Sequence, residues 1–275
     1  MKVSVITWDA SFRERFHTIR CFGNQEYTDL EFIWVDYYKS SPKAENTAKI
    51  FSNFKCISLN NDKSMNWHLG ECINDGVKAS TGDLLIIPDG DIVVDEDFVS
   101  CCINEHRSID NLALYFRRYD ERRQDSGKMS KTDVSYLEDN TYLVNPTNYA
   151  GCIALKRSLF DSIDGYELHR AFAGPGINGM ETNTRLRNAG AYIRWSSKKI
   201  YHPWHNDTCS SRIEEEKKVA LIKLAAKYYW MIPYAGVCQS WIVFRRLLLV
   251  SKTASTEECD RILADLPEEL EPYAI

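Results

Sequence analysis

The sequence contains no apolar run long enough to cross a membrane. The longest uncharged apolar stretch of note, Met231 to Phe244, spans about 14 residues and contains Pro233, whereas a membrane-spanning helix needs about 20. At the start of the chain, Met1–Thr7 leads straight into a strand-like segment. Its apolar stretch is too short for the core of a signal peptide, and no small-residue cleavage pattern follows it. We therefore expect a soluble, cytoplasmic protein.

An excess of basic charge is also missing. The chain has 39 acidic and 34 basic residues and a formal net charge of −5, whereas nucleic-acid-binding domains usually carry a marked basic excess. The nine cysteines form no C-x-x-C pair, and their odd, scattered distribution indicates neither a disulfide framework nor a zinc site. These absences argue against nucleic acid as a partner and favour a reducing compartment.

The 275 residues instead alternate short β-rich runs with helical patterns, which is typical of an α/β domain with a mostly parallel sheet. Strands are expected at Val3–Thr7, Glu31–Asp36, Phe54–Leu59, Leu84–Ile87, Asn111–Arg117, Tyr149–Leu155, Ala191–Trp195 and Lys199–His202. Helices are expected at Phe12–Phe22, Asn66–Ser80 and Met180–Asn188. The charged segment Arg117–Lys131 is expected to be a loop, either a lid or a solvated connection.

The C-terminal part, residues 206–275, changes to a helical pattern. Ser211 with Glu214, and later Ser255 with Glu258, match the S-x-x-E capping box at the start of amphipathic runs. Residues 230–275 either pack on the rest of the chain, form a homo-oligomer contact, or lie on a membrane surface. Peripheral membrane association therefore stays open.

Two aspartates follow the most apolar of the expected strands. Leu84–Ile87 is a continuous apolar run, as a central strand buried on both faces requires, and it leads into Pro88-Asp89-Gly90-Asp91. Open α/β sheets bind ligands at the carboxyl ends of such strands. Gly90 permits a tight turn, and carboxylate oxygens suit Mg²⁺ or Mn²⁺. Asp89 and Asp91 are therefore candidates for binding a metal together with a ribose or diphosphate.

Two histidines follow the last expected strand. Neutral imidazole is a common metal ligand, and the end of a strand can bring a distant histidine beside an aspartate. We predict that His202 completes the metal site, with His205 as the alternative. A hydrogen-bonded structural corner around Pro203 is the competing interpretation.

A glycine-rich segment, residues 174–179, precedes Glu181 near the start of an expected helix. A carboxylate near a helix N-terminus and beside such a loop is well placed to act as a general base. The alternative is that Glu181 only complements the helix dipole.

The order of these motifs resembles family-2 glycosyltransferases with the GT-A fold. In those enzymes an N-x-G-I-x-x-A-x-G-D run leads into a strand that ends in D-x-D, and the segment from Asn74 to Asp91 is similar. Residues 150–166 resemble the family segment G-x-x-x-x-x-R-x-x-F-x-x-I-G-G-Y, Val3–Thr7 resembles the first strand, and Asp36 matches the acid that contacts the nucleoside. The resemblance spans residues 3–205, and as an ordered set it is specific.

The resemblance implies a GT-A catalytic domain over residues 1–205, followed by the helical extension at 206–275. Residues 1–110 would bind the nucleotide sugar and residues 111–205 would form the acceptor side. A cofactor ion, Mn²⁺ or Mg²⁺, would be held by Asp91 and His202 and would offset charge on the departing diphosphate. The implied donor-binding residues are Thr7, Trp8, Asp36, Asn74, Asp89, Gly90 and Asp91. Trp8 either stacks on uracil or is buried beside the first strand.

The chain departs from the family at one motif. The family usually shows E-D-x-(D/E)-L-x-x-R-L-x-x-A-G, whereas Glu181 is the only acid between Asn178 and Gly190. The resemblance implies that Glu181 deprotonates the acceptor hydroxyl as it attacks the anomeric carbon, which inverts the configuration.

We therefore expect a metal-dependent, inverting glycosyltransferase. It would move a hexose or N-acetylhexosamine from a UDP-sugar to a glycan or glycoconjugate acceptor, in polysaccharide or glycolipid assembly. Because the Glu-Asp pair is absent, a second hypothesis is a sugar-nucleotide-binding or scaffold protein with weakened catalysis. A nucleotidyltransferase would need a glycine-rich phosphate loop near the N-terminus, and Thr7–Arg13 contains no glycine.

Overall fold

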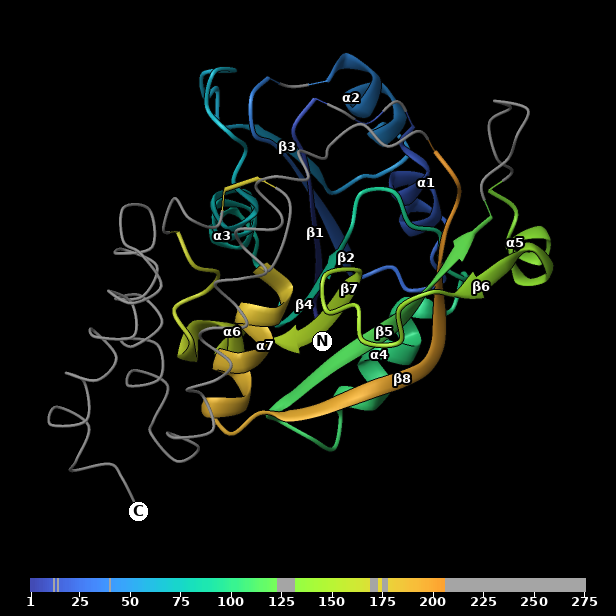
Figure 1. Cartoon of the computed structure of the whole chain (residues 1–275), viewed down its shortest axis with the longest axis vertical. Coiled ribbons are helices and arrows are strands. Elements are labelled where there is room, and N and C mark those ends of the chain that lie inside the picture. The colour runs from blue at the N-terminus through green and yellow to red at the C-terminus, as the bar shows by residue number, and fades with distance from the viewer. Residues whose placement is uncertain are drawn as a thin grey trace, which may run out of the picture.

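The structure is a computed structural model of the chain (Figure 1). It describes residues 1–11, 13, 15–39, 41–122, 132–168, 173–174 and 178–205. The helical extension expected at 206–275, and the oligomer or membrane contact expected at 230–275, lie outside the described residues. The domain boundary at residue 205 therefore stays a prediction. No helix among the described residues has the length and apolarity to span a bilayer.

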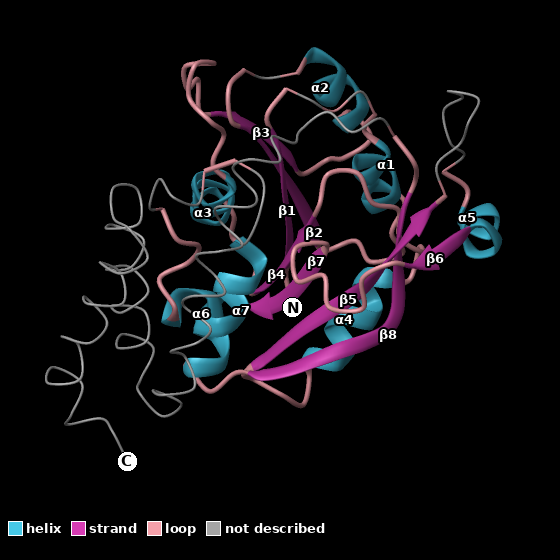
Figure 2. Cartoon of the chain, viewed as in Figure 1, coloured by secondary structure: helices cyan, strands magenta, loops and turns pink. Residues whose placement is uncertain are grey.

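The described residues form an eight-stranded sheet with helices on both faces (Figure 2). The strands are β1 (Val3–Asp9), β2 (Leu30–Asp36), β3 (Phe54–Ser58), β4 (Leu84–Pro88), β5 (Leu112–Glu121), β6 (Thr141–Leu143), β7 (Cys152–Lys156) and β8 (Tyr192–His202). The helices are α1 (His17–Gly23), α2 (Pro42–Ala48), α3 (Leu69–Ala79), α4 (Phe98–His106), α5 (Val134–Asn140), α6 (Arg157–Ser162) and α7 (Asn178–Asn188).

The sheet is mostly parallel. Its order is β3-β2-β1-β4-β7-β5-β6, and β8 pairs with β5. Parallel pairing joins β1 to both β2 and β4, β2 to β3, and β5 to β8. Strands β7 and β6 run in the opposite direction, because β7 pairs antiparallel with β4 and β5, and β6 pairs antiparallel with β5. The expected α/β architecture is confirmed.

The central strand β4 is apolar because helices cover both of its faces. Leu84 and Ile86 pack in a core with α1, α2 and α4, while Leu85 and Ile87 pack in a second core with α3, α6 and α7. Every residue of β4 is buried. The Asp89–Asp91 turn therefore follows a rigid strand in the middle of the sheet.

The pair β5–β8 differs from the sequence expectation. The predicted loop beginning at Arg117 is wrong over residues 117–121, because β5 continues to Glu121. The two strands predicted at Ala191–Trp195 and Lys199–His202 form one strand, β8. The pairing runs from Leu112 opposite Tyr192 to Asp120 opposite His202, with a register shift between Tyr115 and Arg117. Backbone hydrogen bonds stabilise this pairing whatever the side chains are, so a charged segment extends as a strand. Helix α1 also begins at His17, later than the expected Phe12.

Two of the sequence motifs contact each other at Asn74. The Asn74 amide donates from Nδ2 to the carbonyl oxygen of Tyr166 and accepts at Oδ1 from the Tyr166 N–H, and the donor–acceptor distance is 2.8 Å in both hydrogen bonds. Gly165 precedes Tyr166 with a φ of +66°, and a Cβ on Gly165 would lie 2.6 Å from Asn74 Oδ1. The contact fastens α3 to the turn that follows α6.

Gly165→Ala is expected to lower the free energy of unfolding by about 2–4 kcal/mol. A left-handed backbone costs alanine about 1–2 kcal/mol, and the new methyl group would separate Asn74 from Tyr166, which removes two hydrogen bonds of about 1 kcal/mol each. Gly190→Ala is the matched control, because Gly190 has a φ of +78° with nothing within 4 Å of its Cβ position. Urea unfolding followed by circular dichroism would compare the two variants, and equal losses would refute the Asn74 contact.

Candidate active site

The turn after β4 is held on two sides by neighbouring strands. The Asp89 N–H donates to the carbonyl oxygen of Gly151, just before β7, over 2.9 Å. Thr7 in β1 donates its hydroxyl to the carbonyl oxygen of Pro88, also over 2.9 Å. The carboxylates of Asp89 and Asp91 are thereby presented from a fixed backbone at the carboxyl end of β4.

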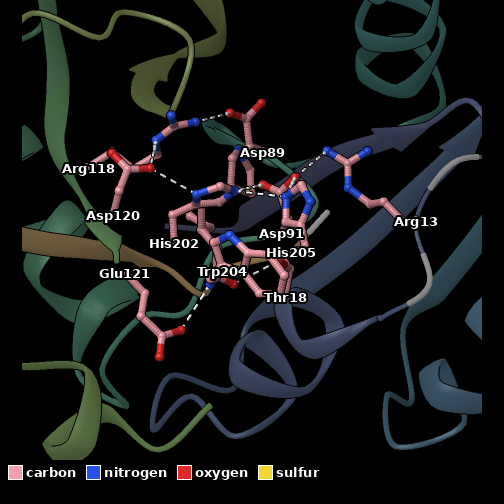
Figure 3. A network of polar contacts seen from close by, with 12 residues as sticks. Arg13, Thr18, Asp89, Asp91, Arg118, Asp120, Glu121, His202, Trp204 and His205 are labelled. Atoms are coloured by element: carbon pink, nitrogen blue, oxygen red, sulfur yellow. Dashed lines mark hydrogen bonds and ion pairs between the residues drawn. The ribbon is translucent and has the colours of Figure 1, made fainter. Parts of the chain in front are cut away.

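The end of β8 brings both histidines to Asp91. Val93, just after the turn, exchanges backbone hydrogen bonds with Tyr201 over 2.8 and 2.9 Å. His202 Nε2 then lies 3.8 Å from Asp91 Oδ1, and His205 Nε2 lies 3.6 Å from Asp91 Oδ2 (Figure 3). The two Nε2 atoms are 3.1 Å apart. One ligand atom from each of the three residues fits within 4.8 Å.

This group fits a divalent metal ion. Asp91 Oδ1 is buried and has no hydrogen-bond partner, which is costly for a carboxylate unless a cation binds it. One carboxylate and two imidazoles are a known donor set for divalent transition-metal ions. The sequence left His202 and His205 as alternatives, and the structure brings both beside Asp91.

Asp120 orients the ring of His202. Its Oδ1 lies 2.8 Å from His202 Nδ1 and 3.1 Å from Arg118 Nε. Because an ionised carboxylate only accepts hydrogen bonds, His202 donates from Nδ1, and Nε2 is left to face Asp91 and His205. Arg118 Nη1 also lies 3.7 Å from Asp89 Oδ2. A continuous chain of polar contacts therefore runs from Asp89 through Arg118 and Asp120 to His202 (Figure 3).

Glu121 holds the segment between the histidines. Its Oε2 accepts the Trp204 N–H over 3.0 Å, and its Oε1 accepts the hydroxyl of Tyr136 in α5 over 2.8 Å. Glu121 is buried. The loop that carries His205 is therefore attached to the end of β5.

The pKa values of the two aspartates of the turn are shifted in opposite directions. Burial opposes ionisation of Asp91, but Arg13, His202 and His205 outweigh it and hold the pKa of Asp91 well below its usual range. Burial and the charge of Asp91 raise the pKa of Asp89, against the opposing effect of Arg118. Asp91, the residue that faces the histidines, therefore ionises more readily than Asp89.

The expected nucleoside side lies at the ends of β1 and β2. Asp36 is fully buried, its Oδ2 accepts the Ser41 N–H over 3.1 Å, and its Oδ1 has no hydrogen-bond partner. Burial raises the pKa of Asp36 to about 7. Trp8 is only 6% exposed and packs against Trp67 in a tilted arrangement, with ring centroids 4.6 Å apart.

Glu181 lies in the first turn of α7 and is paired along the helix. Both of its carboxylate oxygens bind Arg185, one of them from Nη2 over 2.9 Å, and Arg185 also donates to the carbonyl oxygen of Ile163. The Glu181 side chain is 2% exposed. Burial raises the pKa of Glu181 although Arg185 opposes the shift.

Of the predicted site residues, the structure gathers Thr7, Asp89, Gly90, Asp91, His202 and His205 around the turn after β4. Asn74 instead binds the backbone of Tyr166 through both ends of its amide. Sequence reasoning missed Arg13, Arg118, Asp120 and Glu121. The two-residue alternation of Arg118 and Asp120 after Phe116 was the available signal for the pair on β5, whereas Arg13 gave none.

Comparison with known proteins identifies the fold. The model of the family described as glycosyl transferase family 2 matches residues 17–164, more than half of the chain. No curated protein sequence matches. A mannosyltransferase from Pyrobaculum calidifontis, solved with GDP-Man and Mn²⁺, is 13% identical with a TM-score of 0.58, over 99% of this chain and 81% of that one.

Two further structures are similar. TarS 1–349 of S. aureus, solved with UDP-GlcNAc, is 16% identical with a TM-score of 0.55, over 99% of this chain and 82% of that one. GalNAc-T7, solved with UDP, GalNAc and Mn²⁺, is 13% identical with a TM-score of 0.61, over 98% of this chain and 57% of that one. At these identities the likeness shows a shared GT-A architecture. Together with the family match, it means that the chain belongs to glycosyl transferase family 2.

Proposed function

We propose that the protein is a metal-dependent glycosyltransferase that moves a hexose or N-acetylhexosamine from a UDP-sugar to a glycan or glycoconjugate acceptor, with inversion. The observation that carries the proposal is the convergence of Asp91, His202 and His205 at the carboxyl end of β4. The similar structures were solved with GDP-Man and Mn²⁺, with UDP, GalNAc and Mn²⁺, or with UDP-GlcNAc. These ligands support a nucleotide sugar as donor and Mn²⁺, with Mg²⁺ as the alternative, as cofactor.

The side chains around the turn divide the work. Asp91 and the two histidines would hold the ion, which supplies Lewis-acid stabilisation of the departing diphosphate when bound. Asp120 keeps His202 in the ligating tautomer, and Glu121 holds the chain that carries His205. Asp89 would contact the ribose or the metal. At the ends of β1 and β2, Thr7, Trp8 and Asp36 would form the nucleoside end of the site.

Glu181 is the proposed base. In a single displacement the acceptor oxygen bonds to the anomeric carbon, the bond from that carbon to the diphosphate breaks, and the acceptor proton goes to a carboxylate. Arg185 binds both oxygens of Glu181, so one of these contacts must open for the proton to be taken. Residues 111–205 would form the acceptor side, whose side chains would select the acceptor and the position of the new linkage.

A second candidate function is donor binding without transfer. The Glu181–Arg185 ion pair favours it, because a carboxylate that is 2% exposed and bound at both oxygens is a poor proton acceptor. Cytoplasmic localisation and polysaccharide assembly are part of the first proposal.

Asp91→Asn is expected to abolish turnover. The test is release of UDP or GDP from a panel of nucleotide sugars with Mn²⁺, together with Mn²⁺ binding by calorimetry. Loss of the ligand charge should weaken Mn²⁺ binding at least as much as loss of a residue that hydrogen-bonds to a metal ligand, which is roughly 10–100-fold. Asp161→Asn, at an exposed position of α6, is the control and should match the wild type.

The same assay separates the two functions. If the wild-type protein releases nucleotide and a metal chelator abolishes this turnover, the result supports the transferase function. Nucleotide binding without turnover by the wild-type protein supports the binding function, and absence of both binding and turnover refutes the two together.

Asp120→Asn is expected to weaken Mn²⁺ binding by about 10–100-fold, the usual effect of losing a carboxylate behind a ligating histidine. The amide can still accept from Nδ1, so the melting temperature should change little. Asp139→Asn, exposed on α5, is the matched control. Unchanged Mn²⁺ affinity in Asp120→Asn would show that Asp120 does not position His202.

Glu181→Gln is expected to lower kcat by about 10²–10⁴-fold, as loss of a general base does. The donor KM and Mn²⁺ affinity should stay the same, and the amide oxygen can still accept from Arg185. Glu96→Gln, at an exposed position, is the control. A wild-type kcat in Glu181→Gln would exclude it as the base, and a change in donor KM alone would make it a binding residue.

A further inference from the structure

A buried arginine lies against the turn that carries Asp91. Arg13 Nη2 is 3.3 Å from Asp91 Oδ2, and Nη1 is 3.4 Å from Asp9 Oδ1. Nη1 also donates to the carbonyl oxygen of Trp8 over 3.0 Å. The Arg13 side chain is 6% exposed. Its charge is therefore directed at the turn and away from solvent.

The surrounding residues are shaped to receive this guanidinium. Its central carbon lies 5.3 Å from the centre of the Trp8 ring, a cation–π distance. A Cβ at Gly90 would lie 2.6 Å from Arg13 Nε and 2.9 Å from Cζ. Any larger residue at position 90 would displace Arg13. The glycine between the two aspartates thus makes room for the arginine as well as for the turn.

Arg13 balances a local excess of negative charge. Burial alone would lower the pKa of Arg13, but Asp91, Asp9 and Asp89 reverse the effect and raise it. Asp9 and Asp91 are both shielded from solvent, with side-chain exposures of 1% and 17%. Carboxylates this close together and this poorly hydrated need a resident cation to stay ionised.

The Asp91 carboxylate therefore faces basic side chains on two sides, with Arg13 on one and the two histidines on the other (Figure 3). Its Oδ2 faces Arg13, and the same carboxylate faces His202 and His205 with 3.8 and 3.6 Å separations. A divalent ion held by these three residues would contact the Asp91 carboxylate, and the Arg13 guanidinium would contact the same carboxylate. Two positive charges on one carboxylate repel each other, so each weakens the binding of the other.

We propose that Arg13 is a built-in counter-ion of Asp91, which opposes metal binding while no donor is present and binds the donor diphosphate once metal and donor are together. The inference rests on the proposed function. The diphosphate supplies the negative charge that lets Arg13 and the metal coexist, since guanidinium groups bind phosphate oxygens in a bidentate manner. Metal and nucleotide then bind cooperatively, each raising the affinity for the other by the same factor.

The test measures Mn²⁺ and UDP separately by calorimetry in wild type, Arg13→Gln and Arg13→Lys. Arg13→Gln should bind Mn²⁺ alone about 10-fold more tightly, because one unit charge beside the ligand is removed. At saturating Mn²⁺ it should bind UDP about 10-fold more weakly, the order expected for loss of a charge-assisted contact. Arg13→Lys retains the charge, so its affinity for Mn²⁺ alone should match the wild type while its affinity for UDP falls.

A control variant and a second test variant complete the experiment. Arg20→Gln, at an exposed position of α1, should change neither affinity. Gly90→Ala displaces the guanidinium without removing any charged group from the chain, and it should tighten Mn²⁺ binding in the same direction as Arg13→Gln. It also tests the inference if Arg13→Gln does not fold.

The opposite changes in the two affinities distinguish this role from a structural one. A purely structural arginine would, when replaced, weaken Mn²⁺ and UDP binding together, and that result in Arg13→Gln, or in Gly90→Ala where it alone folds, overturns the inference. Unchanged affinities overturn it as well. Failure of the wild-type protein to bind UDP and Mn²⁺ at all would instead refute the proposed function.

Discussion

The parallel pairing of β5 with β8 determines where the candidate metal site is assembled. Its register places Asp120 opposite His202, and the backbone bonds between Tyr201 and Val93 bring the end of β8 against the turn after β4. Asp91 and His202 are far apart in the sequence, and this pairing makes them neighbours. A one-residue slip would turn His202 to the other face, because side chains alternate along a strand.

Charge balance is the second constraint on the site. Asp9, Asp89, Asp91 and Asp120 would repel one another in a poorly hydrated pocket, and two arginines from distant parts of the chain, Arg13 and Arg118, lie among them. The arrangement leaves Asp91 ionised and raises the pKa of Asp89. The chain's own arginines offset part of the negative charge of these four aspartates, and the net charge of −5 for the whole sequence does not show this local balance. The mild acidity of the whole sequence is thus a poor guide to the local field.

Features that depend on local pattern were predictable from the sequence, and features that depend on pairing were not. The continuous apolar run of β4 predicts a buried central strand followed by Asp89 and Asp91, and the structure confirms this strand. The sequence pattern predicts a loop at Arg118 and Asp120. The strand over residues 117–121 carries charged side chains and is formed by backbone hydrogen bonds to β6 and β8, which no local pattern shows. Arg13 belongs to a segment without regular structure, where side-chain direction follows from packing on Trp8 and Gly90.

Motif positions in this chain divide into those that position chemistry and those that fasten the fold. Asn74 and Gly165 come from two motifs far apart in sequence, yet their joint work is a contact between α3 and the turn after α6. Gly90 serves a turn and an arginine at once. Glu181 shows the same division within one residue: the helix pairs it with Arg185, while the motif position suggests a base. A residue can satisfy both demands only if its structural partner can release it, so a base at Glu181 would accept a proton only after Arg185 had released one of its oxygens.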